Sequence, residues 1–300
     1  MAVVLITGGS GLVGRALTKA LLARGDEVRW LSRAAGSWNG VRAYEWDVTH
    51  GTIDAESLRG VERIVHLAGA SIAGGRWSKA RISELISTRA GSARLLLRCA
   101  REAGCRPQCI VSASGVGYYG AVTQDEPFTE DDPPGTDTIA RITVEWERAV
   151  DEWASQCRVV KLRTPVVLAL EGGALAKLAA LARCGLAAPL GSGTQWMPWI
   201  HIEDLTNAYV RALNDVTTQG AYNVIGGNST NREFMQALAV AVRRPMWLPP
   251  VPGPLLRMAL GEAADLLLKG SPVSSSRAEG AFRQRGHGLK EELLTLLKQR

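Results

Sequence analysis

Short apolar runs and longer amphipathic stretches alternate along the first 165 residues of the chain. Leu12–Arg24 has apolar residues at helical spacing and is followed by Gly25, which predicts a helix and its end. A second apolar stripe, from Ile82 to Leu97, predicts a helix within 79–101. The apolar runs predict six strands, at Val3–Thr7, Val28–Ser32, Arg42–Asp47, Arg63–Ala68, Cys109–Ser114 and Val159–Arg163. This alternation is typical of an α/β fold with a doubly wound parallel sheet that helices cover on both faces.

The pattern changes after about residue 165, where strand signals become sparse. Proline and glycine cluster at 188–198 and 249–254. One more strand is predicted at Ala221–Ile225, and helical patterns occur at 203–214, 231–243, 254–268 and 288–299. We therefore expect two domains, one at 1–165 with a return segment near 200–226, and a smaller, mostly helical lobe at 166–300.

The composition is that of a globular protein, with 46% hydrophobic and 21% charged residues over 300 positions. The formal charge of +6 comes from scattered side chains without a run of five basic residues, so we expect no nucleic-acid partner. The chain lacks an apolar stretch that would predict a membrane span, and its N-terminus lacks the basic leader of a signal peptide. Five cysteines without a CxxC pair predict neither a disulfide framework nor a metal site, and they suit a reducing compartment, which we expect to be the cytoplasm.

The most specific signal is a glycine-rich turn between the first strand and the first helix. Its glycines fit GxGxxG and also GxxGxxG. Glycine allows the tight turn, and the missing side chains let backbone amides approach a pyrophosphate at the positive end of the helix. A tight turn without a ligand is the alternative, but the position between strand and helix favours dinucleotide binding. The residues that we expect at the cofactor here are Gly8, Gly9, Ser10, Gly11, Leu12, Val13 and Gly14.

The end of the second strand indicates which dinucleotide is bound. An acidic residue there would bind the ribose 2′-hydroxyl of NAD, whereas this chain has Ser32 and Arg33. A guanidinium suits a phosphate and a serine hydroxyl can donate to it, so we predict NADP; the alternative is an ordinary surface arginine. Ligands lie beyond the carboxyl ends of parallel strands, so we also expect the cofactor at two further strand ends, formed by Asp47 and Val48 and by Leu67, Ala68 and Gly69.

These segments together resemble the extended short-chain dehydrogenase/reductase superfamily, and most closely its atypical subgroup of epimerase-family proteins. The resemblance rests on TGGSGLVGRALTKAL at 7–21, HLAGASIAGGRW at 66–77, SASGVGYYG at 112–120 and PLGSGTQWMPWIHIEDL at 189–205. It implies a Rossmann domain at 1–165, NADP as cofactor and a substrate lobe at 166–300. It also implies a homodimer through the helices at 79–101 and 137–155.

The resemblance adds further cofactor candidates. Arg89 falls on the apolar stripe of its helix, so the cation needs a partner there, either the cofactor or a structural carboxylate. Glu84 is a candidate only through its place in the family's cofactor-side helix. Pro165, Val166 and Val167 follow the sixth strand, where related folds place backbone against the nicotinamide, although valines in a core are the alternative.

The catalytic residues are the open question. Active members of the superfamily carry a Tyr and, four residues later, a Lys on one helix face, with a Ser or Thr at a nearby strand end. The chain has Ser114 at that strand end and no YxxxK; the corresponding region begins at Asp137 and precedes Trp146 and Glu147. Tyr118 and Tyr119 are candidates for the missing phenol, with a role as pocket wall as the alternative.

Two functions remain open from the sequence. The first is an NADP-dependent oxidoreductase or epimerase that acts on a nucleotide sugar or another hydroxylated small molecule. The second is a regulatory or sensor protein that retains NADP(H) binding and has lost the chemistry. A Rossmann-type methyltransferase fits poorly because it would have no use for Ser32 and Arg33.

Overall fold

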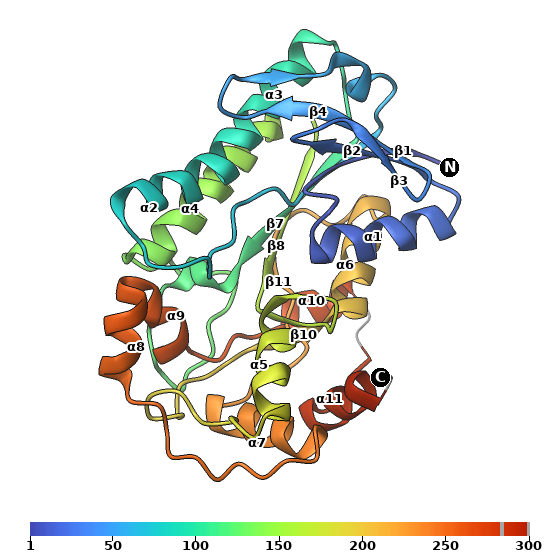
Figure 1. Ribbon diagram of the computed structural model, residues 1–300. Coiled ribbons are helices and arrows are strands. Elements are labelled where there is room, and N and C mark those ends of the chain that lie inside the picture. The colour runs from blue at the N-terminus through green and yellow to red at the C-terminus, as the bar shows by residue number, and fades with distance from the viewer. Residues whose placement is uncertain (283–284, 299–300) are drawn as a thin grey trace.

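The computed structural model describes residues 1–282 and 285–298, and its centre is a mostly parallel sheet of nine strands within that part of the chain (Figure 1). The strand order is β11-β8-β7-β6-β1-β2-β4-β3, and β5 pairs with β4. Only β3 and β5 run antiparallel to their neighbour β4. The strands are β1 (Val3–Thr7), β2 (Glu27–Ser32), β3 (Gly36–Trp38), β4 (Val41–Asp47), β5 (Thr52–Ile53), β6 (Arg63–His66), β7 (Cys109–Gly115), β8 (Arg158–Thr164) and β11 (Gly220–Asn223).

Helices cover both faces of this sheet because alternate strand residues are apolar on both sides. Val4 and Ile6 of β1 pack toward α1 (Leu12–Ala23) and α6 (Ile202–Asn214). Leu5 faces the opposite layer, which consists of α2 (Lys79–Ile86), α3 (Ser92–Glu102) and α4 (Thr138–Asp151). Figure 1 shows these three helices together on one side of the sheet. The order of the strands reverses between β1 and β6, and ligands of such sheets bind at this reversal.

The C-terminal part forms a second, mostly helical layer below the sheet in Figure 1. A short parallel pair, β9 (Val166–Leu168) and β10 (Trp199–His201), leads into it. Its own core includes Leu175, Phe234 and Leu293. The helices are α5 (Gly173–Arg183), α7 (Asn231–Ala241), α8 (Gly253–Leu260), α9 (Asp265–Leu268), α10 (Ser276–Ala281) and α11 (Leu289–Lys298).

The structure confirms the fold class predicted from the sequence, a Rossmann-type doubly wound sheet. Strand β11 returns to it from far along the chain and pairs with β8. The single helix predicted at 79–101 is instead divided by a π-helical turn, η2 (Ser87–Gly91). The helix predicted at 254–268 is divided at Gly261, whose φ of +60° lies outside the right-handed helical region. The prediction of a helix to residue 299 extends beyond the described residues.

No helix among the described residues is long and apolar enough to cross a membrane. All five cysteines are free thiols. Within the same described part of the chain, no group of three or more His, Cys, Asp or Glu side chains has the arrangement of a metal site.

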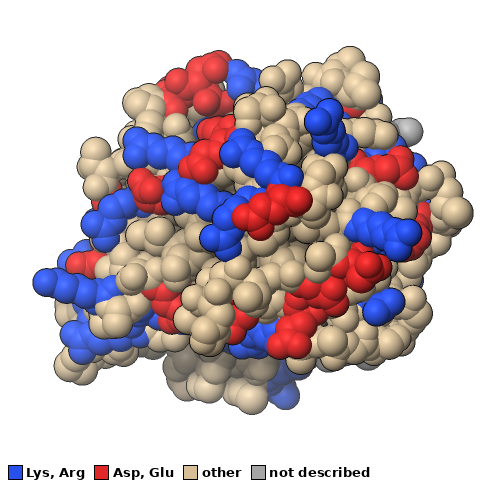
Figure 2. Space-filling view, turned by 90° about the horizontal axis from the view of Figure 1, so that it is seen from above, with Lys and Arg blue, Asp and Glu red and all other residues tan. Residues whose placement is uncertain are grey.

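Positive and negative side chains are interspersed on the face seen from above the view of Figure 1 (Figure 2). Two basic residues of α3 form ion pairs, Arg94 with Glu152 at 2.7 Å and Arg98 with Glu102 at 3.9 Å. These exposed pairs contribute little to stability.

Candidate functional site

The glycines of the first turn are required by close packing. A Cβ at Gly14 would lie 2.4 Å from the Gly8 carbonyl oxygen, and one at Gly9 would lie 2.4 Å from the Trp30 ring. Gly8 itself has a φ of +72°, and a Cβ there would lie 2.9 Å from the backbone of Leu67. The backbone after β1 therefore lies so close to the backbone after β6 that there is no room for a side chain at Gly8.

Gly11 differs from these glycines because it is exposed and a Cβ there would meet only the Gly8 oxygen, at 3.2 Å. It is the N-cap of α1, and neither a side-chain cap nor an acidic residue satisfies the first turn of that helix. The free N–H groups and the positive end of the helix dipole thus face outward at the sheet reversal, which is the arrangement that binds a pyrophosphate.

A buried hydrogen-bond network connects β1 and β6 beneath the glycine turn. Thr7 Oγ1 accepts from the backbone N–H groups of Leu67 and Ala68, both at 3.1 Å. It lies 2.9 Å from His66 Nδ1, and His66 Nε2 lies 3.2 Å from the Arg89 carbonyl oxygen. Because a carbonyl only accepts, Nε2 carries the proton and Nδ1 accepts from Thr7. Burial lowers the pKa of His66 to about 4, so the ring is neutral.

The predicted residues at the adenosine side lie at the ends of β2 and β4. Arg33 is exposed, and within the described residues its guanidinium has no ion-pair partner. Ser32 is half-buried beside it. Asp47 accepts from the backbone N–H groups of Thr49 and His50 and thereby closes the turn after β4, and Val48 is half-buried behind this turn.

Arg89 lies in the π-helical turn η2. Its side chain packs against Gly69, where a Cβ would lie 2.9 Å from the guanidinium carbon. It donates to the carbonyl oxygens of Leu85 and Ala70 at 3.1 and 2.9 Å and lies over the Trp146 ring at 5.2 Å. The structural carboxylate considered from the sequence is absent among its partners in the described residues. Burial lowers the pKa of Arg89 to about 10, which leaves a buried cation that lacks a counter-ion.

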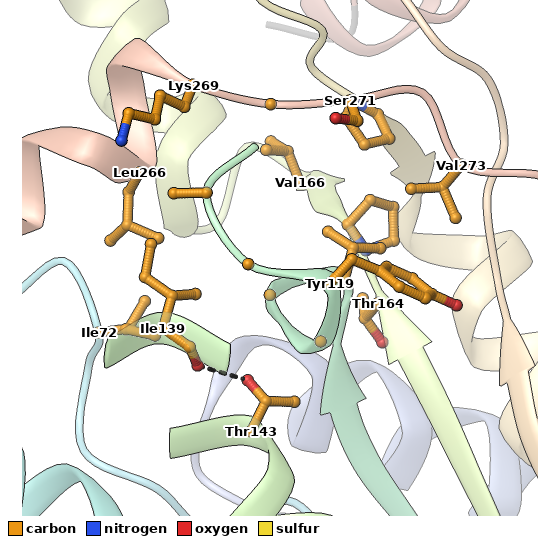
Figure 3. Close-up of a pocket in the computed structure, with 18 of the residues that line it drawn as sticks. Ile72, Tyr119, Ile139, Thr143, Thr164, Val166, Leu266, Lys269, Ser271 and Val273 are labelled. Carbon is orange, nitrogen blue, oxygen red and sulfur yellow. Dashed lines mark hydrogen bonds between the residues drawn. The ribbon is translucent and has the colours of Figure 1, made fainter. Parts of the chain in front are cut away.

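A cavity of about 370 Å³ begins at this cation and continues toward the C-terminal lobe. Figure 3 shows its wall, with Ile72, Ile139 and Leu266 together on one side and Val166 and Val273 on the other. Ser114, Thr164 and Pro165 contribute from the ends of β7 and β8. The cavity therefore joins the carboxyl ends of the sheet strands to residues of the second lobe, as Rossmann-type substrate sites do.

Ser114 is fixed from behind by a buried ion pair. Its Oγ donates to Glu147 Oε1 at 2.6 Å, and Arg163 donates to both oxygens of the same carboxylate at 2.8 and 3.0 Å. Burial alone would raise the pKa of Glu147, but the hydrogen bonds and charge of Arg163 lower it, so the carboxylate is ionised. Sequence reasoning did not identify Arg163, and the signal was a charged residue in an apolar strand.

The two tyrosines considered as the missing phenol are bound to the same ion pair. Tyr119 OH donates to Asn223 Oδ1 at 2.7 Å and accepts from Arg163 at 3.0 Å, and its hydroxyl points away from the cavity in Figure 3. Burial raises the pKa of Tyr119 to about 12, opposite to the shift that a catalytic lysine produces. Tyr118 packs its ring against the Arg163 guanidinium at 3.5 Å and is outside the cavity lining.

Ile139 and Thr143 occupy one face of α4 and line the same cavity as Ser114. They are four residues apart, so they project from the same side of the helix. Thr143 Oγ1 donates to the Ile139 carbonyl oxygen at 3.1 Å (Figure 3). This face of α4, in the region where the resemblance leads us to expect the Tyr and Lys of active members, thus presents a hydrocarbon side chain and an internally bonded hydroxyl.

The remaining sequence candidates lie at different distances from the cavity. Pro165 and Val166 line it, whereas Val167 is partly buried and packs against the hydrophobic core that includes Ile200 and Leu205. The Glu84 carboxylate is half-exposed, pairs with Arg81 at 2.7 Å and does not line the cavity. The backbone carbonyl oxygen of Glu84 accepts a hydrogen bond from the Thr88 side chain at 2.8 Å.

The fold and this site define a dinucleotide-binding protein of the Rossmann type, with a cavity between the strand ends of the sheet and the C-terminal helical layer. Residues 4–225 match the family model described as the NAD dependent epimerase/dehydratase family. The chain belongs to that family, which confirms the resemblance stated from its sequence.

Similar proteins span nearly the whole chain. The epimerase family protein SDR39U1 of mouse is 34% identical over 279 residues, which cover 91% of this chain and 92% of the relative. An epimerase family protein of Mycobacterium bovis is 38% identical and covers 98% and 96% of the two chains. The crystal structure of human SDR39U1 (isoform 2) with NADPH has a TM-score of 0.88, 30% identity and 99% coverage of both chains.

Proposed function

We propose that the chain is an NADP(H)-dependent oxidoreductase or epimerase-like enzyme whose substrate is a small molecule with a hydroxyl or carbonyl group. The observation that carries the proposal is the uncapped N-terminus of α1 at the sheet reversal, next to a cavity that Ser114 lines. NADP(H) as cofactor is supported by the similar human structure that was determined with NADPH.

The residues of the site divide into two groups in this proposal. Ser10, Leu12 and Val13 offer N–H groups to the pyrophosphate, whereas the Gly11 N–H donates to the Gly8 carbonyl oxygen at 3.0 Å. Arg33 and Ser32 bind the 2′-phosphate, and Arg89 supplies a positive charge at the cavity end. When bound, the cofactor supplies or accepts a hydride at its nicotinamide. The Ser114 hydroxyl gives its proton to Glu147, so its oxygen can orient a substrate hydroxyl by accepting a hydrogen bond from it.

Titration of the protein with NADPH and NADH tests the cofactor assignment. We expect NADPH to bind at least tenfold more tightly than NADH, and Arg33→Ala to abolish this preference without weakening NADH binding. Arg59→Ala, a change at another exposed arginine, serves as the control. Equal affinities for the two cofactors in the unmodified protein would contradict NADP(H), and no binding of either would contradict the whole proposal.

A second function is supported by the occupation of the α4 face by Ile139 and Thr143, since a cofactor-binding protein without the acid–base pair suits a sensor or regulator. Its signature would be NADPH stabilisation of the fold without turnover in a screen of alcohols, aldehydes and ketones. Turnover that is lost in Ser114→Ala would favour the enzyme instead.

Two further assignments belong to this proposal. The free cysteines support a reducing compartment, which we take to be the cytoplasm. The homodimer through α2, α3 and α4 rests on the resemblance alone, and the mass of the protein in solution tests it.

A further inference from the structure

We infer that the substrate of this cavity is a small, uncharged and largely apolar molecule with one hydroxyl or carbonyl group, and that nucleotide sugars are excluded. The inference rests on the proposed function and names the substrate class of the same site. Three features of the cavity wall carry it: the state of its hydroxyl groups, the state of its charges, and its size.

Every side-chain hydroxyl in the wall already donates to a protein acceptor. The acceptors are the Glu147 carboxylate, an Asn223 amide oxygen and three backbone carbonyl oxygens. The bonds are Ser114 to Glu147 at 2.6 Å, Tyr119 to Asn223 at 2.7 Å, Ser271 to Val122 at 2.7 Å, Thr143 to Ile139 at 3.1 Å and Thr164 to Leu162 at 3.1 Å. These hydroxyls can still accept a hydrogen bond but have no proton left to donate, so a ring with several hydroxyls would lose its water and find few donors in return.

The charges of the wall give no site for two phosphates. Lys269 is paired with Asp265 at 2.9 Å, and Asp265 is also paired with Arg257 at 3.3 Å. Arg89 is the one cation of the described wall that lacks an acidic partner, and the cofactor proposed above takes it. The two negative phosphates of a nucleoside diphosphate sugar would therefore enter a cavity that contains the Asp265 carboxylate and offers no free cation to pair with them.

The size and lining favour a compact hydrocarbon frame. Aliphatic and aromatic side chains form most of the wall, among them Ile72, Phe128, Ile139, Trp196 and Leu266. The cofactor would itself take part of the 370 Å³. The remaining volume suits a molecule of one or two rings, for which burial of apolar surface supplies the affinity.

The test uses four probes on the 300-residue chain: NADPH, the neutral ketone 1-tetralone, the matched anion 1,2,3,4-tetrahydro-1-naphthoate, and UDP-glucose. Binding of the last three to the NADP⁺-saturated protein is measured by calorimetry and by the shift in Tm. We expect 1-tetralone to bind more tightly than the matched anion, and UDP-glucose not to bind. Tighter binding of the anion or of UDP-glucose, or no binding of 1-tetralone, would overturn the inference. Failure of NADPH to bind would instead contradict the proposed function.

Adjacent leucines of α9 provide a matched pair of variants. Leu266 lines the cavity, whereas Leu267 is 37% exposed and does not. Leu266→Asn should weaken 1-tetralone binding about tenfold, since it places an amide in an apolar wall, and Leu267→Asn should leave it within twofold. Both variants should keep the affinity for NADPH, which shows that they fold. Equal effects of the two changes on 1-tetralone would show that the ligand binds elsewhere and would overturn the inference.

Discussion

The carboxylate of Glu147 accepts a 2.6 Å hydrogen bond from Ser114 at the wall of the cavity. The carboxylate and its partner Arg163 are 5% and 3% exposed, so the serine is held by a charge pair that water does not reach. The orientation of Ser114 toward a substrate therefore depends on an interaction between α4 and β8 that lies behind it.

Glu147→Gln should lower the free energy of unfolding by about 3 kcal/mol, because it leaves the Arg163 charge buried without a counter-charge. Urea denaturation at pH 7.5 measures the loss. The control is Glu145→Gln on the same helix, which removes an exposed pair with Arg148 and should cost less than about 1 kcal/mol. Similar losses of unfolding free energy in the two variants would show that the buried pair contributes no more to stability than the exposed pair.

Gly11→Ala should weaken NADPH binding at least tenfold with little change in stability. The new methyl group would contact only the Gly8 oxygen, yet it would stand at the uncapped end of α1 where the pyrophosphate is proposed to bind. Calorimetric titration with NADPH measures the affinity. Gly36→Ala is the matched control, since that glycine is exposed and has open space around its Cβ position. Wild-type affinity in Gly11→Ala would place the cofactor elsewhere.

The pH dependence of stability should contain a contribution from His66. Its pKa is about 4 in the folded protein and near 6.5 when unfolded, so below pH 6.5 the unfolded chain binds a proton that the folded protein does not. Stability should therefore fall between pH 6.5 and 4, by up to about 1.4 kcal/mol per pH unit from this group.

Urea denaturation at several values between pH 7.5 and 5 checks this dependence. His66→Gln should flatten the fall relative to the unmodified protein. His50→Gln is the control, because Asp47 raises the pKa of His50 and its removal should not flatten the acid side. An unchanged slope in His66→Gln would show that another group titrates.

The sequence predicts the parts of this site that depend on local backbone. The glycine turn, the strand ends around Leu67 and the position of Ser114 follow from short patterns, because each is determined by one strand and its next residues. The link from Glu147 to Arg163 and Tyr119 joins α4, β8 and η3 (Val116–Tyr119), and no local pattern contains it. The π-helical turn of Arg89 was likewise missed, since an apolar stripe of period 3.6 cannot show one inserted residue.

The residues on the α4 face explain why the sequence left the chemistry open. Ile139 and Thr143 line the same cavity as Ser114 and lie one turn apart on α4, but neither side chain is an acid or a base. The double change Ile139→Tyr and Thr143→Lys would supply a phenol and an ammonium group one turn apart. If the chain already turns over a ketone with NADPH, the pair should raise kcat at least tenfold, because a positioned proton donor contributes about 10²–10⁴-fold.

The measurement is the loss of NADPH absorbance with 1-tetralone or a smaller ketone as substrate. The double variant Ile139→Phe and Thr143→Met is the control, since it adds comparable bulk without a proton donor or a charge. A pH profile separates the two further, because only the variant with Tyr and Lys should gain a basic limb from the new phenol. Equal rates and equal profiles for both double variants would show that the hydride does not transfer to a carbon near this face of α4, and would move the reacting position away from Ser114.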